Sequence, residues 1–409
     1  MKKVTTMRIK GIDYLAMLLL LLSPILGIYG NPDGWSYETL LVLPSSALFF
    51  IYYFMQRNSI TGIFNPLPKH LAGYFFYWGF LMFILSVSIP MTVIQAYLAF
   101  FLFFATFRLK KFIVFYKLFG IVCISFFFVQ YVSYHITGER MSGIISSLPL
   151  YIPMDITSRV GSMRSCSFFS EPAHFAQFLI PLLAIELYYD KSKYNYFYAA
   201  VIGVVLVYLQ SGNGYMGLAV ILLFLYSRIK EIVKSKFKRI MIWAFVALFI
   251  AAMGYYMING EIGEYILSRQ SELSITYDGQ SSRSGFLRLW RGFYVYNDYN
   301  IFEKIFGCPN TKMQIAHVSA SGMEMVENAE LYFNAFQKVL LNTGVVGVLL
   351  FLNIIVKIWR GNNTCGKAIL GSFVAISFVS AIYMSHAMIL FLLLAYSFKK
   401  FNCQIEKNK

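Results

Sequence analysis

Charged residues are scarce in this sequence. Asp, Glu, Lys and Arg make up 13% of the 409 residues, whereas 58% of the residues are apolar. A soluble domain carries about 25% charged residues, so the composition excludes an ordinary water-soluble protein. It indicates a membrane protein instead.

Metal-binding and nucleotide-binding patterns are also missing. The five histidines are scattered, and no Asp-x-Asp or His-x-x-x-His spacing occurs in the segments that we place outside the membrane. The sequence contains no P-loop. We therefore expect neither a metal nor a cofactor. Of the five cysteines, only Cys166 and Cys308 lie on the oxidising outer side in the topology below. One disulfide between them is an option, and two free thiols are the alternative.

Long apolar runs dominate what the sequence does contain. Such runs predict helices that cross a hydrocarbon core of roughly 30 Å. We predict an all-α, polytopic membrane protein of about 12 transmembrane helices in a single integral membrane domain, residues 1–409. If the last two runs form one tilted span, the number is 11. The runs fall at 14–30, 38–55, 71–88, 91–107, 112–134, 172–189, 195–210, 215–227, 240–258, 338–356, 368–384 and 386–398.

The charge distribution predicts the orientation, because Lys and Arg beside membrane spans are retained in the cytoplasm. With the N-terminus inside, the inner loops hold 25 of the 35 Lys and Arg residues and 5 of the 19 Asp and Glu residues. Both termini are therefore predicted to be cytoplasmic. We expect no cleavable signal peptide before the first span. The net charge of +16 is explained by topology and by contact with membrane lipid, and it requires no nucleic acid.

Two long polar segments, residues 135–171 and 259–337, fall on the outer side in this topology. Among their basic residues and those of the other outer turns, 7 of 10 are Arg, against 6 of 25 on the inner side. A guanidinium group binds phosphate or carboxylate through two parallel hydrogen bonds, which the lysine ammonium does not. This preference is what binding of a diphosphate would require.

Two predicted hairpins are too short for two full spans and a turn. Their turns, 211–214 and 383–386, are therefore expected to lie below the outer membrane surface. Backbone outside a helix is tolerated there only beside protein or a water-filled cavity. The alternative is that both helix pairs are merely shortened and that flanking lysines reach the interface.

Residues 283–296 predict an amphipathic helix in the outer interface. Arg283, Arg288 and Arg291 fall on one face, and aromatic side chains fall on the other. We expect the aromatic face to point into the membrane and the arginines to point toward headgroups or a cavity mouth. The three arginines are candidate substrate ligands. The alternative is that they contact only lipid phosphate.

A second group of candidates precedes the sixth predicted span. Arg159 and Arg164 lead into a segment in which Pro172 suits the first turn of a helix, so Ser170 or Glu171 is the expected cap. Glu171 and His174 are one helical turn apart and follow the two arginines. This geometry would serve acid/base chemistry. A purely structural cap is the alternative.

These residues resemble a known family. The sequence Arg-Ser-Cys-Ser-Phe-Phe-Ser-Glu-Pro-Ala-His-Phe-Ala over 164–176 comes five residues after Arg159. It is followed by a polar turn between the next two spans, a large late outer loop with arginines, and Gly344-Val345-Val346-Gly347. Together they look like the Wzy-like bacterial polysaccharide polymerases and the related O-antigen ligases. The ligases usually carry a histidine shortly before the Gly-x-x-Gly box, whereas residues 324–332 contain none. The polymerase is therefore favoured.

The resemblance implies an inverting, GT-C-like glycosyltransferase of the bacterial inner membrane. Its donor and acceptor would be undecaprenyl-diphosphate-linked glycans at the outer face, and a chain-length regulator protein is an expected partner. The proton acceptor is left open: Glu171 ranks first, followed by Glu327 and Glu330. An O-antigen ligase and a lipid-linked glycan flippase or other secondary transporter are the alternatives. Few ionisable residues within the spans and two long outer segments count against a transporter.

Overall fold

A computed structural model describes residues 11–57, 66–86, 91–151, 164–189, 193–232, 235–237, 240–241, 289–309 and 333–407. Over these residues the chain is helical, and the only extended pairing is two isolated bridges, Tyr29 with Leu150 and Gly30 with Ser36. The helices are α1 (Ile12–Leu26), α2 (Tyr37–Arg57), α3 (Lys69–Ser86), α4 (Met91–Thr106), α5 (Leu109–Thr137), α7 (Pro172–Tyr188), α8 (Lys193–Tyr208), α9 (Gly212–Ile232), α13 (Arg291–Asp298), α14 (Ile301–Phe306), α16 (Ala335–Trp359), α17 (Thr364–Ser377) and α18 (His386–Lys407).

The all-α prediction is confirmed for the described residues, since eleven of the predicted apolar runs overlap with helices. The run at 240–258 lies almost entirely outside the described residues. Three described helices are long and apolar enough to cross a membrane by length and composition: Tyr37–Met55, Leu109–Thr137 and Ala335–Trp359. The apolar helices at α1, α4, α7, α8, α9 and α17 are shorter. The chain is thus a helical membrane protein, with three clear candidate spans.

One predicted boundary was wrong. The run at 368–384 does not form one helix, because α17 ends at Ser377 and residues 378–385 form a turn before α18. Met384 in this turn has a φ of 57°, a left-handed conformation that a continuous helix cannot contain. The sequence placed a turn at 383–386, and the apolar composition of residues 378–382 concealed its earlier start.

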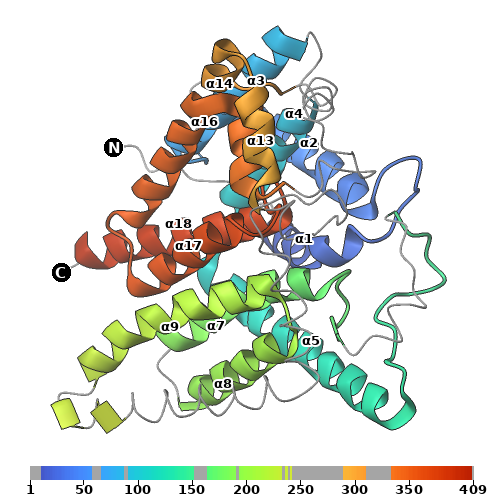
Figure 1. Ribbon diagram of the computed structural model, residues 1–409, viewed down its shortest axis with the longest axis vertical. Coiled ribbons are helices and arrows are strands. Elements are labelled where there is room, and N and C mark those ends of the chain that lie inside the picture. The colour runs from blue at the N-terminus through green and yellow to red at the C-terminus, as the bar shows by residue number, and fades with distance from the viewer. Residues whose placement is uncertain are drawn as a thin grey trace.

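The helices pack in two groups that meet near the middle of the molecule (Figure 1). In one, α7 contacts α8, α9 and α17; in the other, α2 and α1 contact α4, and α3 contacts α16. Helix α18 contacts members of both groups, including α1, α7 and α17. The turn that precedes α18 is therefore close to the junction of the groups.

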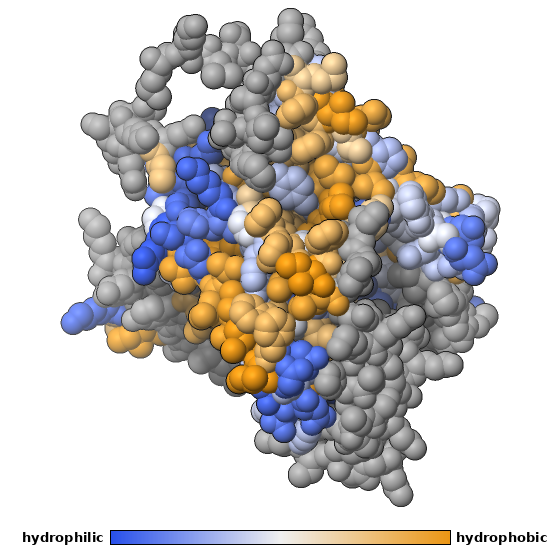
Figure 2. Space-filling model, turned by 90° about the horizontal axis from the view of Figure 1, so that it is seen from above, coloured by the Kyte–Doolittle hydropathy of each residue, from blue (hydrophilic) through white to orange (hydrophobic). Residues whose placement is uncertain are grey.

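Many large apolar side chains remain exposed on the outside of this bundle. Leu223 is 75% exposed, Phe76 73% and Leu48 69%. On the face seen in Figure 2, hydrophobic residues spread over the centre and hydrophilic residues gather toward the edges. Exposure of so much apolar surface is unusual for a soluble monomer. Contact with lipid accounts for it.

The predicted outer turns contact one another. The turn after α1 pairs with the loop after α5, because the Gly30 amide donates to the Pro149 carbonyl (3.0 Å) and the Tyr151 amide donates to the Ile28 carbonyl (2.9 Å). Predicted inner segments also meet, as Arg108 before α5 pairs with Asp13 at the start of α1 (3.0 Å). These contacts agree with the alternation of loops, although they do not assign either end to the cytoplasm.

Candidate functional site

A serine-rich turn at residues 164–171 leads into α7, and one side chain of α5 holds it. The Gln130 side-chain carbonyl accepts from the Ser167 amide (2.8 Å), and its amide nitrogen donates to the Ser167 carbonyl (3.2 Å). Ser167 has a φ of 55°, which these bonds help to maintain. Phe168 stacks on Phe126 of α5 with ring centroids 4.3 Å apart. The turn is thus rigidly attached to α5.

Glu171 is the N-cap residue of α7, as predicted, but its side chain makes no capping hydrogen bond. It is exposed. Ser170 does not cap through its hydroxyl either, because Ser170 Oγ lies 2.6 Å from His174 Nδ1. Glu171 therefore occupies the predicted cap position, but its carboxylate does not cap the helix. That carboxylate faces solvent beside a serine–histidine pair.

Two arginines tie this turn to its neighbours. Arg140 is buried and donates to the Arg164 carbonyl (2.5 Å). Arg164 in turn donates from its Nη2 to the carbonyl of Gln210 (3.0 Å), in the turn between α8 and α9. Gln210 has a φ of 48°. Arg164 thus lies between the serine-rich turn and the first of the two short turns that the sequence singled out.

The two short turns meet at Ser380. Its hydroxyl accepts from Asn213 of α9 (3.3 Å) and from Gln177 of α7 (3.2 Å). Its carbonyl accepts from the Ala335 amide at the start of α16 (2.9 Å). We call Ser380, Gln177 and Asn213 the Ser380 cluster. It brings the second turn of α7 and the N-terminal ends of α9 and α16 to the turn before α18. Neither short turn would be expected to contact the other from the sequence alone.

Arg291 does not lie where the sequence predicted. It is fully buried, with 0% of its surface exposed, while Phe293 of the predicted aromatic face is 47% exposed. Helix α13 packs on α16, and the Gln337 side chain donates to the Leu289 carbonyl (2.8 Å). The expected headgroup-facing arginine is therefore an interior residue in the described part of this helix. Burial also raises the pKa of the nearby Tyr299 phenol, which stays protonated and is no base.

The Gly-x-x-Gly box forms a joint between α14 and α16. Gly344 has a φ of 63° and interrupts the helical conformation of α16. A Cβ there would collide with the Ile305 carbonyl and the Gly307 amide. The Cys308 amide donates to the Leu341 carbonyl (2.7 Å). The box therefore has a structural function, which is to admit the end of α14 into a kink of α16.

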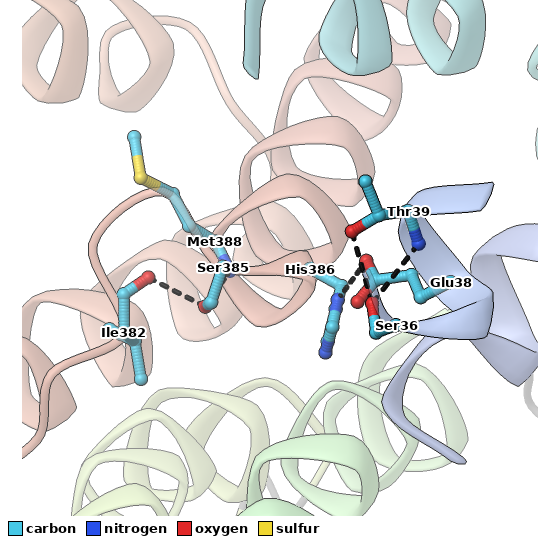
Figure 3. Close-up of polar contacts among 7 residues, drawn as sticks. All are labelled: Ser36, Glu38, Thr39, Ile382, Ser385, His386 and Met388. Atoms are coloured by element: carbon cyan, nitrogen blue, oxygen red, sulfur yellow. Dashed lines mark hydrogen bonds and ion pairs between the residues drawn. The ribbon is translucent and has the colours of Figure 1, made fainter. Parts of the chain in front are cut away.

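An ionisable pair that our sequence ranking missed joins α2 to α18. His386 Nδ1 lies 2.6 Å from Glu38 Oε1, and the two residues are 348 positions apart (Figure 3). Their side chains are 26% and 25% exposed. Glu38 is not among the carboxylates that the sequence ranks as proton acceptors. The available signal was an acidic residue two positions after Ser36, at the start of an apolar run, and no local pattern identifies its partner.

The remaining predicted site residues lie outside the described residues: Arg159, Arg283, Arg288, Glu327 and Glu330. Cys166 and Cys308 are both buried free thiols, so the optional disulfide is not formed. Within the part of the chain that the structure describes, no group of three His, Cys, Asp or Glu side chains could hold a metal ion.

Comparisons with known proteins do not identify the chain: no protein-family model matches it, and no curated protein matches it. The resemblance over residues 155–360 therefore rests on the residues themselves. What the site offers chemically is a set of helix N-terminal ends, a guanidinium group, an exposed carboxylate and two histidines. Helix N-terminal ends and arginine favour anionic groups, and histidine and carboxylate can exchange protons.

Proposed function

We propose that this protein is a glycosyltransferase that polymerises undecaprenyl-diphosphate-linked oligosaccharide repeat units at the outer face of the bacterial cytoplasmic membrane. In the proposal it has about 12 spans in a GT-C-like arrangement, with both termini cytoplasmic. A protein that regulates chain length would be a partner. No cofactor is required.

The observation that best supports this function is the convergence of polar turns at the Ser380 cluster. Helices α9 and α16 begin there, α7 contributes Gln177 from its second turn, and Ser380 contacts all three. Partial positive charge at helix N-terminal ends stabilises an anion, and Arg164 adds a full charge beside the turn between α8 and α9. Such a site suits a lipid-linked diphosphate, because the apolar helices around it can accommodate the lipid chain while the turns contact the charged group.

The reaction requires two things from the protein. The acceptor hydroxyl oxygen bonds to the anomeric carbon of the donor sugar as the bond from that carbon to the diphosphate oxygen breaks. The departing undecaprenyl diphosphate takes the electron pair, so positive charge and hydrogen-bond donors must stabilise it. The hydroxyl proton must pass to a base. Arg164 and, outside the described residues, Arg159, Arg283 and Arg288 are the candidates for the first task.

Glu171 is the candidate from the sequence for a catalytic or substrate-binding carboxylate. Its exposed side chain makes no cap to α7, which leaves it available to sugar hydroxyls. His174, held by Ser170, is on the same turn of α7. Both would contact the glycan rather than the lipid.

The surface glycan of a strain that lacks this gene tests the proposal. A polymerase is supported if the strain places single repeat units on the anchor lipid and if the returned gene restores long chains. A strain with no repeat units at the surface at all would instead indicate the ligase or the flippase. Long chains of normal length in the deletion strain would exclude any of these functions.

A further inference from the structure

The Glu38–His386 pair occupies the first turns of two helices that begin at the same place. Glu38 is the second residue of α2, and His386 is the first residue of α18. His386 follows Ser380 by six residues in the turn that carries the Ser380 cluster. The pair is thus on the side of the bundle where the proposed substrate would bind.

Neither member of the pair is needed to cap its own helix. The Ser36 hydroxyl caps α2 by accepting from the Thr39 amide (3.2 Å), and the Ser385 hydroxyl caps α18 by accepting from the Met388 amide (3.4 Å). Figure 3 shows Ser36 and Ser385 beside Glu38 and His386. Serines that precede both residues therefore satisfy the helix ends, and capping does not explain the pair.

The pair fixes the orientation of the imidazole ring. When His386 is neutral, Nδ1–H donates to Glu38 Oε1, and the lone pair is then on Nε2. Nε2 points away from Glu38 in Figure 3 and makes no hydrogen bond with any of the described residues. A carboxylate that orients an imidazole whose second nitrogen is open is the arrangement that proton-accepting histidines use.

The pair packs closely against α1 and is nevertheless partly exposed. A Cβ added at Gly27, the C-cap of α1, would lie 3.0 Å from Glu38 Oε2, tighter than an ordinary contact, and 3.7 Å from His386 Cε1, so glycine allows this close approach. About a quarter of each side chain is exposed. A sugar hydroxyl could therefore approach the ring, which would not be so if the pair were sealed in the core.

Other charged groups on the helices around α18 are engaged elsewhere. Asp13 of α1 pairs with Arg108. Glu186 of α7 pairs with Lys117 of α5. In the turn itself, the Tyr383 hydroxyl bonds to that of Tyr74 (2.6 Å). Within the described residues, Glu38 is the charged group in contact with His386.

We propose that His386 is the base that accepts the proton of the acceptor hydroxyl, and that Glu38 is the residue that positions it. The inference rests on the proposed glycosyl transfer. The proton moves from the acceptor oxygen to His386 Nε2 as that oxygen bonds to the anomeric carbon and undecaprenyl diphosphate leaves. Glu38 keeps Nδ1 protonated and stabilises the imidazolium that forms. Glu171 then binds sugar hydroxyls and takes no proton.

His386→Asn is the direct test, because the amide nitrogen of Asn can replace Nδ1 as the donor to Glu38 while the basic nitrogen is lost. The full-length protein is assayed in membranes of the deletion strain, with the lipid-linked repeat units extracted from that strain as substrate. We expect normal abundance and a rate lower by about a hundredfold or more. Ser385→Ala, which removes the cap of α18 but keeps the imidazole, is the comparison variant and should lose far less activity than His386→Asn.

The pH profile separates catalysis from a structural function. Wild-type activity should fall on the acid side as one group is protonated, since imidazolium cannot accept a proton. The residual activity of His386→Asn should lack this acid limb. A wild-type rate for His386→Asn, or a residual rate that keeps the limb, would overturn the assignment.

If His386→Asn is not recovered in the membrane, Glu38→Gln tests whether the pair acts in catalysis or only in structure. Turnover should fall with the apparent KM for the extracted lipid unchanged, the acid limb should move, and Glu38→Asp should restore part of the turnover. Unchanged turnover with an unmoved limb would contradict the proposal. If the deletion strain accumulates no lipid-linked single units, the proposed polymerase function itself fails, and the two failures are thereby distinguishable.

Discussion

Two ion pairs join distant helices at different places in the bundle, and they differ in what they leave exposed. Lys117 of α5 is 3.0 Å from Glu186 of α7, whose side chain is 0% exposed. Glu38 of α2 and His386 of α18 are 2.6 Å apart and about one quarter exposed. The first pair compensates a carboxylate that is enclosed by apolar helices. The second leaves a titratable nitrogen that can be reached.

This difference shows that ionic character alone does not identify a functional pair in a membrane protein. A buried charge must be paired simply to remain in the structure. At the partly exposed ends of two helices, by contrast, water could solvate each side chain separately. The fixed geometry of the Glu38–His386 pair therefore needs another explanation. We attribute the first pair to stability and the second to proton transfer.

The largest effect is expected for topology reporters, because each fusion should report entirely one side of the membrane or the other. Reporter fusions after Pro32 and Ser146 should report the outer side, and fusions after Lys193 and Asn362 should report the cytoplasm, because the loop charges alternate. This outcome would place the Glu38–His386 end of the bundle outside and the Lys117–Glu186 end inside. An inverted result at Pro32 and Asn362 together would put the proposed base on the wrong face.

Removal of one partner of the buried pair should have the next largest effect. Lys117→Met leaves the Glu186 charge uncompensated and should destabilise the fold by about 3–5 kcal/mol. We expect low membrane abundance and a lower melting temperature in detergent. Lys117→Met/Glu186→Met should recover abundance, because two apolar residues replace the pair. Equal loss in the single and double variants would show that the pair does more than neutralise charge.

Arg164→Lys tests whether activity requires the two parallel hydrogen-bond donors of the guanidinium group. Lysine keeps the charge but not the geometry that reaches the Gln210 carbonyl or two phosphate oxygens. Loss of a charge-assisted contact predicts a rate that is about tenfold to hundredfold lower, nearly as low as that of Arg164→Ala. Product per unit of membrane protein is the measurement. A fully active lysine variant would leave Arg164 without a function in substrate binding.

Glu171→Gln should have the smallest effect of the set. The amide keeps the size of the side chain but weakens hydrogen bonds to sugar hydroxyls, so activity should fall by about tenfold, with normal abundance and shorter glycans. Ser170→Ala, which loses the hydrogen bond to His174 but keeps the carboxylate, is the comparison variant and should shorten the glycans less than Glu171→Gln does. If Glu171→Gln gives wild-type chain lengths, the serine-rich turn is purely structural.

Much of the helical framework could be predicted from the sequence. Apolar runs reveal helices regardless of partners, and Pro172 correctly marked the start of α7. The turn that the sequence placed at 383–386 begins earlier, at residue 378, and this start was missed because residues 378–382 are mostly apolar. Arg291 was placed on the wrong surface, since periodicity separates two faces without saying which one packs on α16.

The candidate site, too, could be predicted only in part from the sequence. Local patterns identified the serine-rich turn and both short turns, each from consecutive residues. Contacts between them, such as Asn213 with Ser380, depend on how helices pack and leave no local pattern. The pairing of Glu38 with His386 across the whole chain is the clearest example.

Reconstitution is the most direct test of the central claim. The purified full-length protein is placed in phospholipid vesicles with lipid-linked repeat units extracted from the deletion strain, and the glycan length on the lipid is followed with time. We predict chains of several repeat units together with free undecaprenyl diphosphate, and no elongation without the protein. Repeat units that cross the vesicle membrane without becoming longer would contradict the account and identify a transporter.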